Sequence, residues 1–93
     1  MLNLEKNFFK KRILIYGLGK SGLSTYSFLK KNNIISLFDD QIITKKKIKD
    51  THTTYKEIIK KEFDCIIISP GIDINKCKLS RFLKKNHKKF IQI

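Results

Sequence analysis

Residues 12–24 of this 93-residue chain read Arg12-Ile-Leu-Ile-Tyr-Gly-Leu-Gly-Lys-Ser-Gly-Leu-Ser24. The run from Arg12 to Tyr16 is short, continuous and rich in β-branched residues, which is typical of a strand buried on both faces. After the glycines, Leu23, Tyr26 and the Phe28–Leu29 pair recur at helical spacing. The stretch therefore predicts a strand, a glycine turn and a helix over 21–31, in immediate succession.

The remainder of the chain alternates between short apolar runs and amphipathic stretches. Strands are predicted at 34–38, 51–54 (a brief edge strand), 63–68 and 90–93, and helices at 42–49, 55–62 and 75–86. Tyr55, Ile58 and Ile59 are expected on one helix face. Strands alternating with helices imply a parallel sheet with right-handed crossovers. We therefore predict an α/β fold: a Rossmann-like doubly wound sheet of five parallel strands, order 3-2-1-4-5, with residues 1–93 as a single domain.

The chain is strongly basic, with 21 basic and 8 acidic residues and a formal net charge of +13. Such a charge, taken alone, is typical of nucleic-acid-binding proteins. However, lysine supplies 19 of the basic residues and isoleucine occurs 16 times, whereas alanine and tryptophan are absent, a pattern that AT-rich coding produces. Proteins that read phosphates or bases favour arginine, whose planar fork binds bidentately. We interpret the charge as compositional and expect no nucleic-acid partner.

Several classes of protein are not indicated by the sequence. No apolar run approaches the roughly 20 residues of a membrane-spanning helix, and residues 1–12 lack the apolar core of a secretory signal. We expect a cytoplasmic domain without a membrane partner. Cys65 and Cys77 have no zinc-binding spacing with each other or with His52 and His87, so no metal site is predicted. No carboxylate pair, Ser/His/Asp set or Cys/His set is found, and we predict no catalytic residue.

Gly17, Gly19 and Gly22 form the pattern G-x-G-x-x-G between the first strand and the first helix. Gly17 permits a tight turn, Gly19 lets a phosphate approach the backbone, and Gly22 lets the helix pack closely on the sheet. The helix N-terminus adds N–H donors and a positive dipole. Asp39 ends the next strand, where an acidic side chain recognises a ribose or base. The loop therefore favours a nucleotide site over a simple connecting turn.

A second loop, Ser69-Pro70-Gly71, directly follows the predicted strand at 63–68. In a sheet of order 3-2-1-4-5, the first and fourth strands flank the topological switch point, so their C-terminal loops face each other across the crevice that binds ligands. A strand-ending Pro-Gly turn forms without any ligand as well. Together with the glycine loop, however, it is expected to form the second wall of one site.

Three stretches together resemble one family: residues 13–24, Phe38-Asp39-Asp40, and residues 67–72, Ile-Ile-Ser-Pro-Gly-Ile. They are similar to the N-terminal domain of the Mur ligases, above all those that add D-glutamate to UDP-N-acetylmuramoyl-L-alanine. The resemblance covers nearly the whole chain from Arg12 onward. It implies a domain that binds the UDP end of this peptidoglycan precursor and does not bind a dinucleotide.

The resemblance also implies which residues bind UDP. Lys20 and Ser21 correspond to family positions that contact the diphosphate, Asp39 and Asp40 to positions that recognise uracil, and Gly71 lies beside the same nucleotide. The complete expected UDP site is Gly17, Gly19, Lys20, Ser21, Gly22, Asp39, Asp40, Ser69 and Gly71. Two positions depart from the family: Lys20 replaces a frequent apolar residue, and Gln41 stands where some members carry arginine, so position 41 is not included among the expected contacts.

The complete enzymes of this family continue into an ATPase domain, with a Gly-Lys-Ser/Thr phosphate loop, and a C-terminal domain that binds the incoming amino acid. The pattern G-x-x-x-x-G-K-[ST] is absent from these 93 residues. We therefore expect an N-terminal fragment that holds no cofactor and has no ligase activity alone. ATP and Mg²⁺ would act in the complete enzyme, with the missing ligase domains as partners.

A different class of function also fits the glycine loop and the acidic end of the second strand. Both features occur in NAD(P)-binding Rossmann modules of small dehydrogenases and regulatory domains. That hypothesis gives no special role to the Ser69-Pro70-Gly71 loop, which favours the UDP hypothesis.

Overall fold

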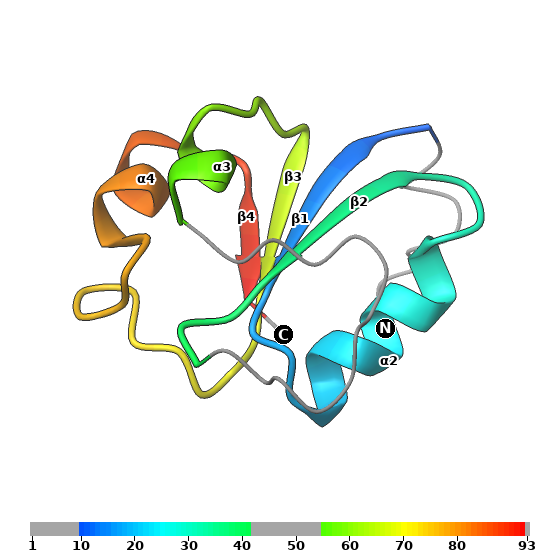
Figure 1. Ribbon diagram of the computed structural model, residues 1–93, viewed down its shortest axis with the longest axis horizontal. Coiled ribbons are helices and arrows are strands. Elements are labelled where there is room, and N and C mark those ends of the chain that lie inside the picture. The colour runs from blue at the N-terminus through cyan, green and yellow to red at the C-terminus, as the bar shows by residue number, and fades with distance from the viewer. Residues whose placement is uncertain (1–9, 42–54, 93) are drawn as a thin grey trace.

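The computed structural model describes residues 10–41 and 55–92. Its elements, in chain order, are β1 (Arg12–Tyr16), α2 (Lys20–Leu29), β2 (Ile34–Phe38), α3 (Tyr55–Ile59), β3 (Cys65–Ile68), α4 (Ser80–Lys85) and β4 (Phe90–Gln92). Figure 1 shows a twisted sheet with α2 on one face and α3 and α4 on the other. No helix among these residues is long and apolar enough to cross a bilayer.

The described strands form one parallel sheet in the order β2-β1-β3-β4. The α/β class and the parallel sheet predicted from the sequence are confirmed. The five-stranded order 3-2-1-4-5 is not, because the sheet has four strands in the described part of the chain. The predicted helix at 42–49 and edge strand at 51–54 lie outside the described residues.

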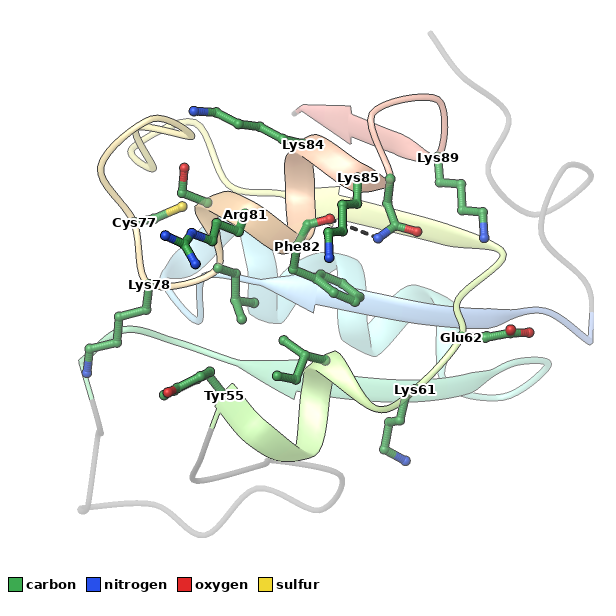
Figure 2. Close-up of a pocket in the computed structure, with 14 residues that line it drawn as sticks. Tyr55, Lys61, Glu62, Cys77, Lys78, Arg81, Phe82, Lys84, Lys85 and Lys89 are labelled. Carbon is green, nitrogen blue, oxygen red and sulfur yellow. Dashed lines mark hydrogen bonds between the residues drawn. The ribbon is translucent and has the colours of Figure 1, made fainter.

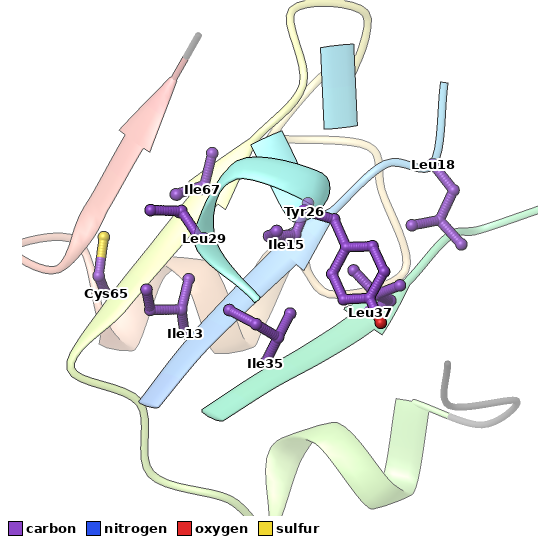
Figure 3. Close-up of a cluster of buried hydrophobic side chains, with 9 residues drawn as sticks. All are labelled: Ile13, Ile15, Leu18, Tyr26, Leu29, Ile35, Leu37, Cys65 and Ile67. Atoms are coloured by element: carbon purple, nitrogen blue, oxygen red, sulfur yellow. The ribbon is translucent and has the colours of Figure 1, made fainter. Parts of the chain in front are cut away.

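Alternate side chains of the strands form two apolar cores, one on each face of the sheet. Along β1, Ile13 and Ile15 pack on the α2 side with Tyr26 and Leu29 of that helix (Figure 3). The second core, on the α3 and α4 side, contains Leu14, Tyr16, Phe38, Ile58, Phe63, Ile66, Ile68, Leu79 and Leu83. Burial on both faces explains why the strands are continuous apolar runs rather than alternating ones.

The helices differ from the predictions in length and in the residues they bury. The predicted helix 75–86 is helical only over Ser80–Lys85. Asp73 begins a separate turn ahead of α4, because its side chain accepts a hydrogen bond from the Asn75 N–H (2.9 Å) and its carbonyl accepts those of Lys76 and Cys77. This is the bonding of a helix N-cap, but the turn does not continue into Ser80, where α4 begins.

Three apolar residues expected on buried helix faces are exposed. Phe28 is 56% exposed whereas its neighbour Leu29 is buried, and Tyr55 and Ile59 are 45% and 47% exposed whereas Ile58 is buried. Successive residues of a helix lie about 100° apart, so when Leu29 and Ile58 point at the sheet their neighbours Phe28 and Ile59 do not. Tyr55 lies one turn before Ile59 and shares its exposed side.

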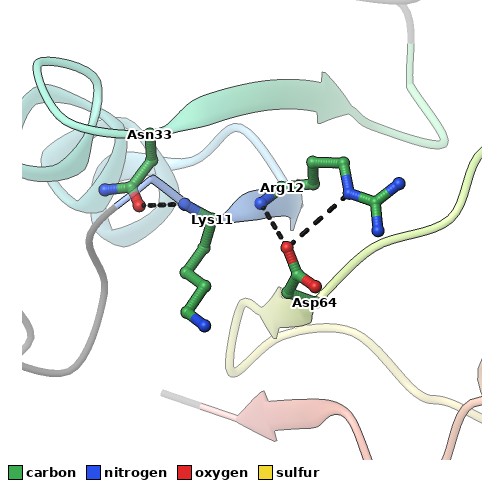
Figure 4. Close-up of polar contacts among 4 residues, drawn as sticks. All are labelled: Lys11, Arg12, Asn33 and Asp64. Atoms are coloured by element: carbon green, nitrogen blue, oxygen red, sulfur yellow. Dashed lines mark hydrogen bonds and ion pairs between the residues drawn. The ribbon is translucent and has the colours of Figure 1, made fainter.

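The amino ends of β1 and β3 are joined by a reciprocal contact (Figure 4). The Arg12 N–H donates to Oδ2 of Asp64 (2.8 Å), and the Asp64 N–H donates to the Arg12 carbonyl (2.7 Å). The Arg12 Nε lies 3.6 Å from the same carboxylate oxygen. The hydrogen bond from the Arg12 backbone, followed by the charge of its guanidinium, lowers the pKa of Asp64 from its ordinary value. Ionised Asp64 therefore ties the two strands together at the edge opposite the predicted site.

Candidate functional site

The predicted loops meet at the carboxyl edge of the sheet because the strands are parallel and in register. Tyr16 pairs with Phe38 on one side and with Ile68 on the other. The chain leaves the sheet at Gly17, Asp39 and Ser69, which are therefore neighbours. The Gly17 N–H donates to the Phe38 carbonyl (2.8 Å), and the Ser69 N–H donates to the Tyr16 carbonyl (3.0 Å).

The three glycines of the first loop are required for different reasons. Gly17 has φ +102°, and a Cβ there would lie 2.6 Å from the Ser69 Oγ. A Cβ on Gly22 would lie only 1.9 Å from the Gly17 carbonyl oxygen, so this glycine lets α2 cross close to the loop. A Cβ on Gly19 would meet nothing within 4 Å. The space beside Gly19 is open, as close approach of a phosphate to the backbone requires.

The N-terminus of α2 lies next to that open space. Gly19 is the N-cap residue, so no side chain caps the helix, and the first turn contains no acidic residue. Lys20 and Ser21 at the start of the helix are exposed. Uncapped N–H groups and the helix dipole attract anions, and the positive charge of Lys20 adds to this attraction. The position is suited to a phosphate group.

Asp39 fixes the glycine loop by hydrogen bonds to the backbone. Its Oδ2 accepts the Leu18 N–H (2.6 Å) and its Oδ1 accepts the Gln41 N–H (2.9 Å). From the other side of the loop, the Ser69 Oγ donates to the Gly17 carbonyl (3.1 Å). The residues after β1, β2 and β3 are therefore connected to one another, and the loop is held in shape without a ligand.

Asp40 turns away from the glycine loop, toward α4. The hydroxyl of Tyr16 donates to its Oδ1, the Lys78 N–H donates to its Oδ2 (3.2 Å), and the Lys78 Nζ donates to its backbone carbonyl (3.0 Å). The Tyr16 hydroxyl also accepts the Leu79 N–H (3.4 Å). Burial, followed by the hydrogen bond to Asp40, raises the pKa of Tyr16 well above its ordinary value, so the hydroxyl keeps its proton and acts as a donor.

Comparison with known proteins identifies the family. The family described as "Mur ligase MurD-like, N-terminal domain" matches residues 11–90. The chain belongs to this family. A curated relative, the UDP-N-acetylmuramoylalanine--D-glutamate ligase of Caldicellulosiruptor saccharolyticus, is 30% identical over an alignment of 101 residues that covers 91% of the chain. The chain spans 20% of the length of that relative. No solved structure shows a significant match.

The MurD-like domain brings some of the predicted site residues together and separates others. Gly17, Gly22, Asp39 and Ser69 are joined by the close contacts described above. Lys20, Ser21 and Gly71 are exposed at the same edge of the sheet. Asp40 is directed toward α4, so the two consecutive carboxylates point to different partners.

Two residues of the MurD-like domain that matter for this edge were not found from the sequence. Tyr16 was counted only as part of an apolar strand, although a phenol at the end of a buried strand needs a partner for its hydroxyl. Lys78 carried no signal, because it is one of 19 lysines and its contact with Asp40 spans 38 residues.

Proposed function

We propose that this domain binds the UDP end of UDP-N-acetylmuramoyl-L-alanine, as the N-terminal domain of a peptidoglycan ligase that adds D-glutamate. Membership of the MurD-like family and the name of the curated relative support the substrate class. The observation that carries the proposal is the open space beside Gly19, at an uncapped helix N-terminus with neighbouring strand-end loops.

In this proposal, the diphosphate lies against Gly19, Lys20 and Ser21, where N–H donors and one positive charge face an anion. Asp39 and Asp40 accept hydrogen bonds from the uracil or ribose. Each carboxylate already accepts two hydrogen bonds within the protein, but an ionised carboxylate has about four acceptor positions. The internal bonds therefore leave acceptor capacity for the nucleoside.

The loop at Ser69 and Gly71 forms the other side of the proposed nucleotide site. Gly71 is exposed, and a Cβ there would meet nothing within 4 Å. The amide-bond chemistry, with ATP and Mg²⁺, is proposed for the further domains of the complete ligase, in the cytoplasm. Binding of one substrate without stabilisation of a transition state gives no rate enhancement, so we propose that the 93-residue chain has no ligase activity alone.

An NAD(P)-binding module is the second candidate, since the glycine loop and Asp39 fit it equally well. Calorimetric titration of the chain with UDP, UDP-N-acetylmuramoyl-L-alanine and NAD separates the two. We expect both uridine ligands to bind more tightly than NAD. Tighter binding of NAD, or no binding of either uridine ligand, would contradict the proposed function.

Gly19→Ala gives a local version of this test. The added methyl group has room in the free protein but occupies the space proposed for the diphosphate. We expect UDP affinity to fall at least about tenfold, or about 1.4 kcal/mol, with no change in fold. Ser27→Ala, on an exposed position of α2 away from the loop, is the matched control and should bind UDP like the wild type. Equal affinity of the two variants would place the diphosphate elsewhere.

A further inference from the structure

A groove of about 950 Å³ lies between α3 and α4, and none of the proposed UDP-binding residues lines it (Figure 2). Its apolar surface comes from Tyr55 and Ile59 on α3 and from Phe82 on α4. Tyr55 and Ile59 are about half exposed, and they are two of the four large apolar residues most exposed in the described chain. Apolar side chains exposed together around a hollow are typical of binding surfaces.

The groove is also strongly cationic. Its basic residues are Lys61, Lys78, Arg81, Lys84, Lys85 and Lys89, and Glu62 is the acidic residue among them. Six of the nine exposed lining residues are basic, against 16 of the 35 exposed residues in the described part of the chain. The groove is therefore more basic than the described surface as a whole.

These cations are not neutralised within the described part of the chain. None of the six forms an ion pair there, and the one side-chain hydrogen bond among them, from Lys78, goes to a backbone carbonyl. Like charges around one hollow repel one another, and an anionic partner relieves that repulsion.

We propose that this groove docks an acidic protein segment that places an aliphatic side chain between α3 and α4. Carboxylates of the segment would face the lysines at the rim, and the aliphatic group would cover Ile59 and Phe82. A protein segment fits better than a nucleic acid because five of the six basic residues are lysines, and Arg81 is the one basic residue of the groove with the planar fork suited to phosphate.

The test uses fluorescence anisotropy with the 93-residue chain and a labelled ten-residue peptide of alternating glutamate and leucine. Lys84→Glu/Lys85→Glu reverses two charges at the end of α4, beside the groove. Lys30→Glu/Lys31→Glu makes the same change in net charge at the end of α2, on the other face of the sheet. We expect the first double variant to lose at least tenfold in affinity for the peptide and the second to lose less than threefold.

The apolar part of the proposal has its own variant and probe. Ile59→Asn should weaken binding of the peptide while the circular dichroism spectrum stays that of the folded chain, since Ile59 is half exposed and lies outside the two buried cores. A peptide with serine in place of leucine should bind wild type and Ile59→Asn equally.

Four results would overturn the proposal. These are absence of peptide binding, equal losses in the two lysine variants, equal binding of a glutamine-for-glutamate peptide, and displacement of the peptide by an oligonucleotide at lower concentration than by unlabelled peptide. The last would assign the groove to nucleic acid. None of them depends on whether UDP binds at the glycine loop.

Discussion

Replacement of Gly22 by alanine tests how closely α2 is packed against the glycine loop. The new Cβ would lie 1.9 Å from the Gly17 carbonyl oxygen, and a contact below 3.0 Å does not occur in practice, so the start of α2 must move by about 1 Å. The obstacle is backbone and cannot rotate away. Overpacking of this kind costs about 1–3 kcal/mol, and the higher helix propensity of alanine returns at most about 1 kcal/mol.

The clash is with backbone, so we expect a cost near the upper end of that range, about 3 kcal/mol, less about 1 kcal/mol from helix propensity. Gly22→Ala should therefore lower the free energy of unfolding by about 2 kcal/mol. For a chain of this size, that corresponds to a melting temperature lower by about 8–16 °C. Urea titration followed by circular dichroism gives the free energy, and a thermal melt gives the temperature.

Gly19→Ala makes the same chemical change three residues earlier and is the control. Its Cβ would meet nothing, and the φ of −73° at Gly19 suits alanine. Alanine is a poorer N-cap than glycine by up to about 1 kcal/mol. Because alanine also restricts the unfolded chain, which returns about 0.4–1 kcal/mol, the stability should change by less than about 0.5 kcal/mol. Unfolding of Gly22→Ala like the wild type, or equally strong destabilisation of Gly19→Ala, would contradict the clash at Gly22.

Three further predictions follow from the polar contacts and the buried thiol. Tyr16→Phe removes the hydroxyl bonded to Asp40 and should lower the free energy of unfolding by about 1.5–3 kcal/mol, the range for a hydrogen bond to a charged group. A loss under about 0.5 kcal/mol, measured by urea titration, would contradict the contact. Because the pKa of Asp64 is lowered, its ionised form stabilises the fold above about pH 4, and this contribution is lost as pH falls. The melting temperature of Asp64→Asn should therefore approach that of the wild type below about pH 4. A difference in melting temperature that stays constant with pH would contradict the Arg12 contact. Burial, followed by the charge of Asp64, raises the pKa of the Cys65 thiol to about 11. At pH 8 this thiol should therefore react with a disulfide reagent only in denaturant, which mass spectrometry of the labelled peptides measures. Rapid labelling of the native protein would contradict the burial of Cys65.

The sequence predicted the sheet better than it predicted the helices. The strands at 12–16 and 34–38 were predicted with their observed bounds. A five-residue apolar run that ends at glycine or aspartate is too short for a buried helix, so a buried strand is the remaining interpretation. The helix at 75–86 was too long because the turn that begins at Asp73 does not continue into Ser80–Lys85, an interruption that the apolar spacing does not indicate. The choice of Leu29 over Phe28 as the buried residue depends on how α2 lies on the sheet, which adjacent apolar residues do not indicate.

The candidate site was predicted as a set of residues but not as a set of contacts. The glycine pattern located the loop and the helix N-terminus, since each glycine has a local role. The divergence of Asp39 and Asp40 depends instead on Leu18 and Tyr16, which lie 21 and 24 residues away in the sequence. Such pairings form only when the strands are assembled into the sheet. The sequence therefore does not indicate that Asp39 and Asp40 bond to different partners.

The central position of β1 has a consequence for how the chain folds. β1 is made early, yet one of its two neighbours is β3, and the Arg12–Asp64 contact between them spans 52 residues. β1, α2 and β2 are close in sequence and can associate first, because short loops close at little entropic cost. Until Cys65–Ile68 emerges from the ribosome and pairs, one edge of β1 has no partner. Docking of β3 should therefore limit the folding rate, and before it occurs the nascent chain is most prone to aggregate.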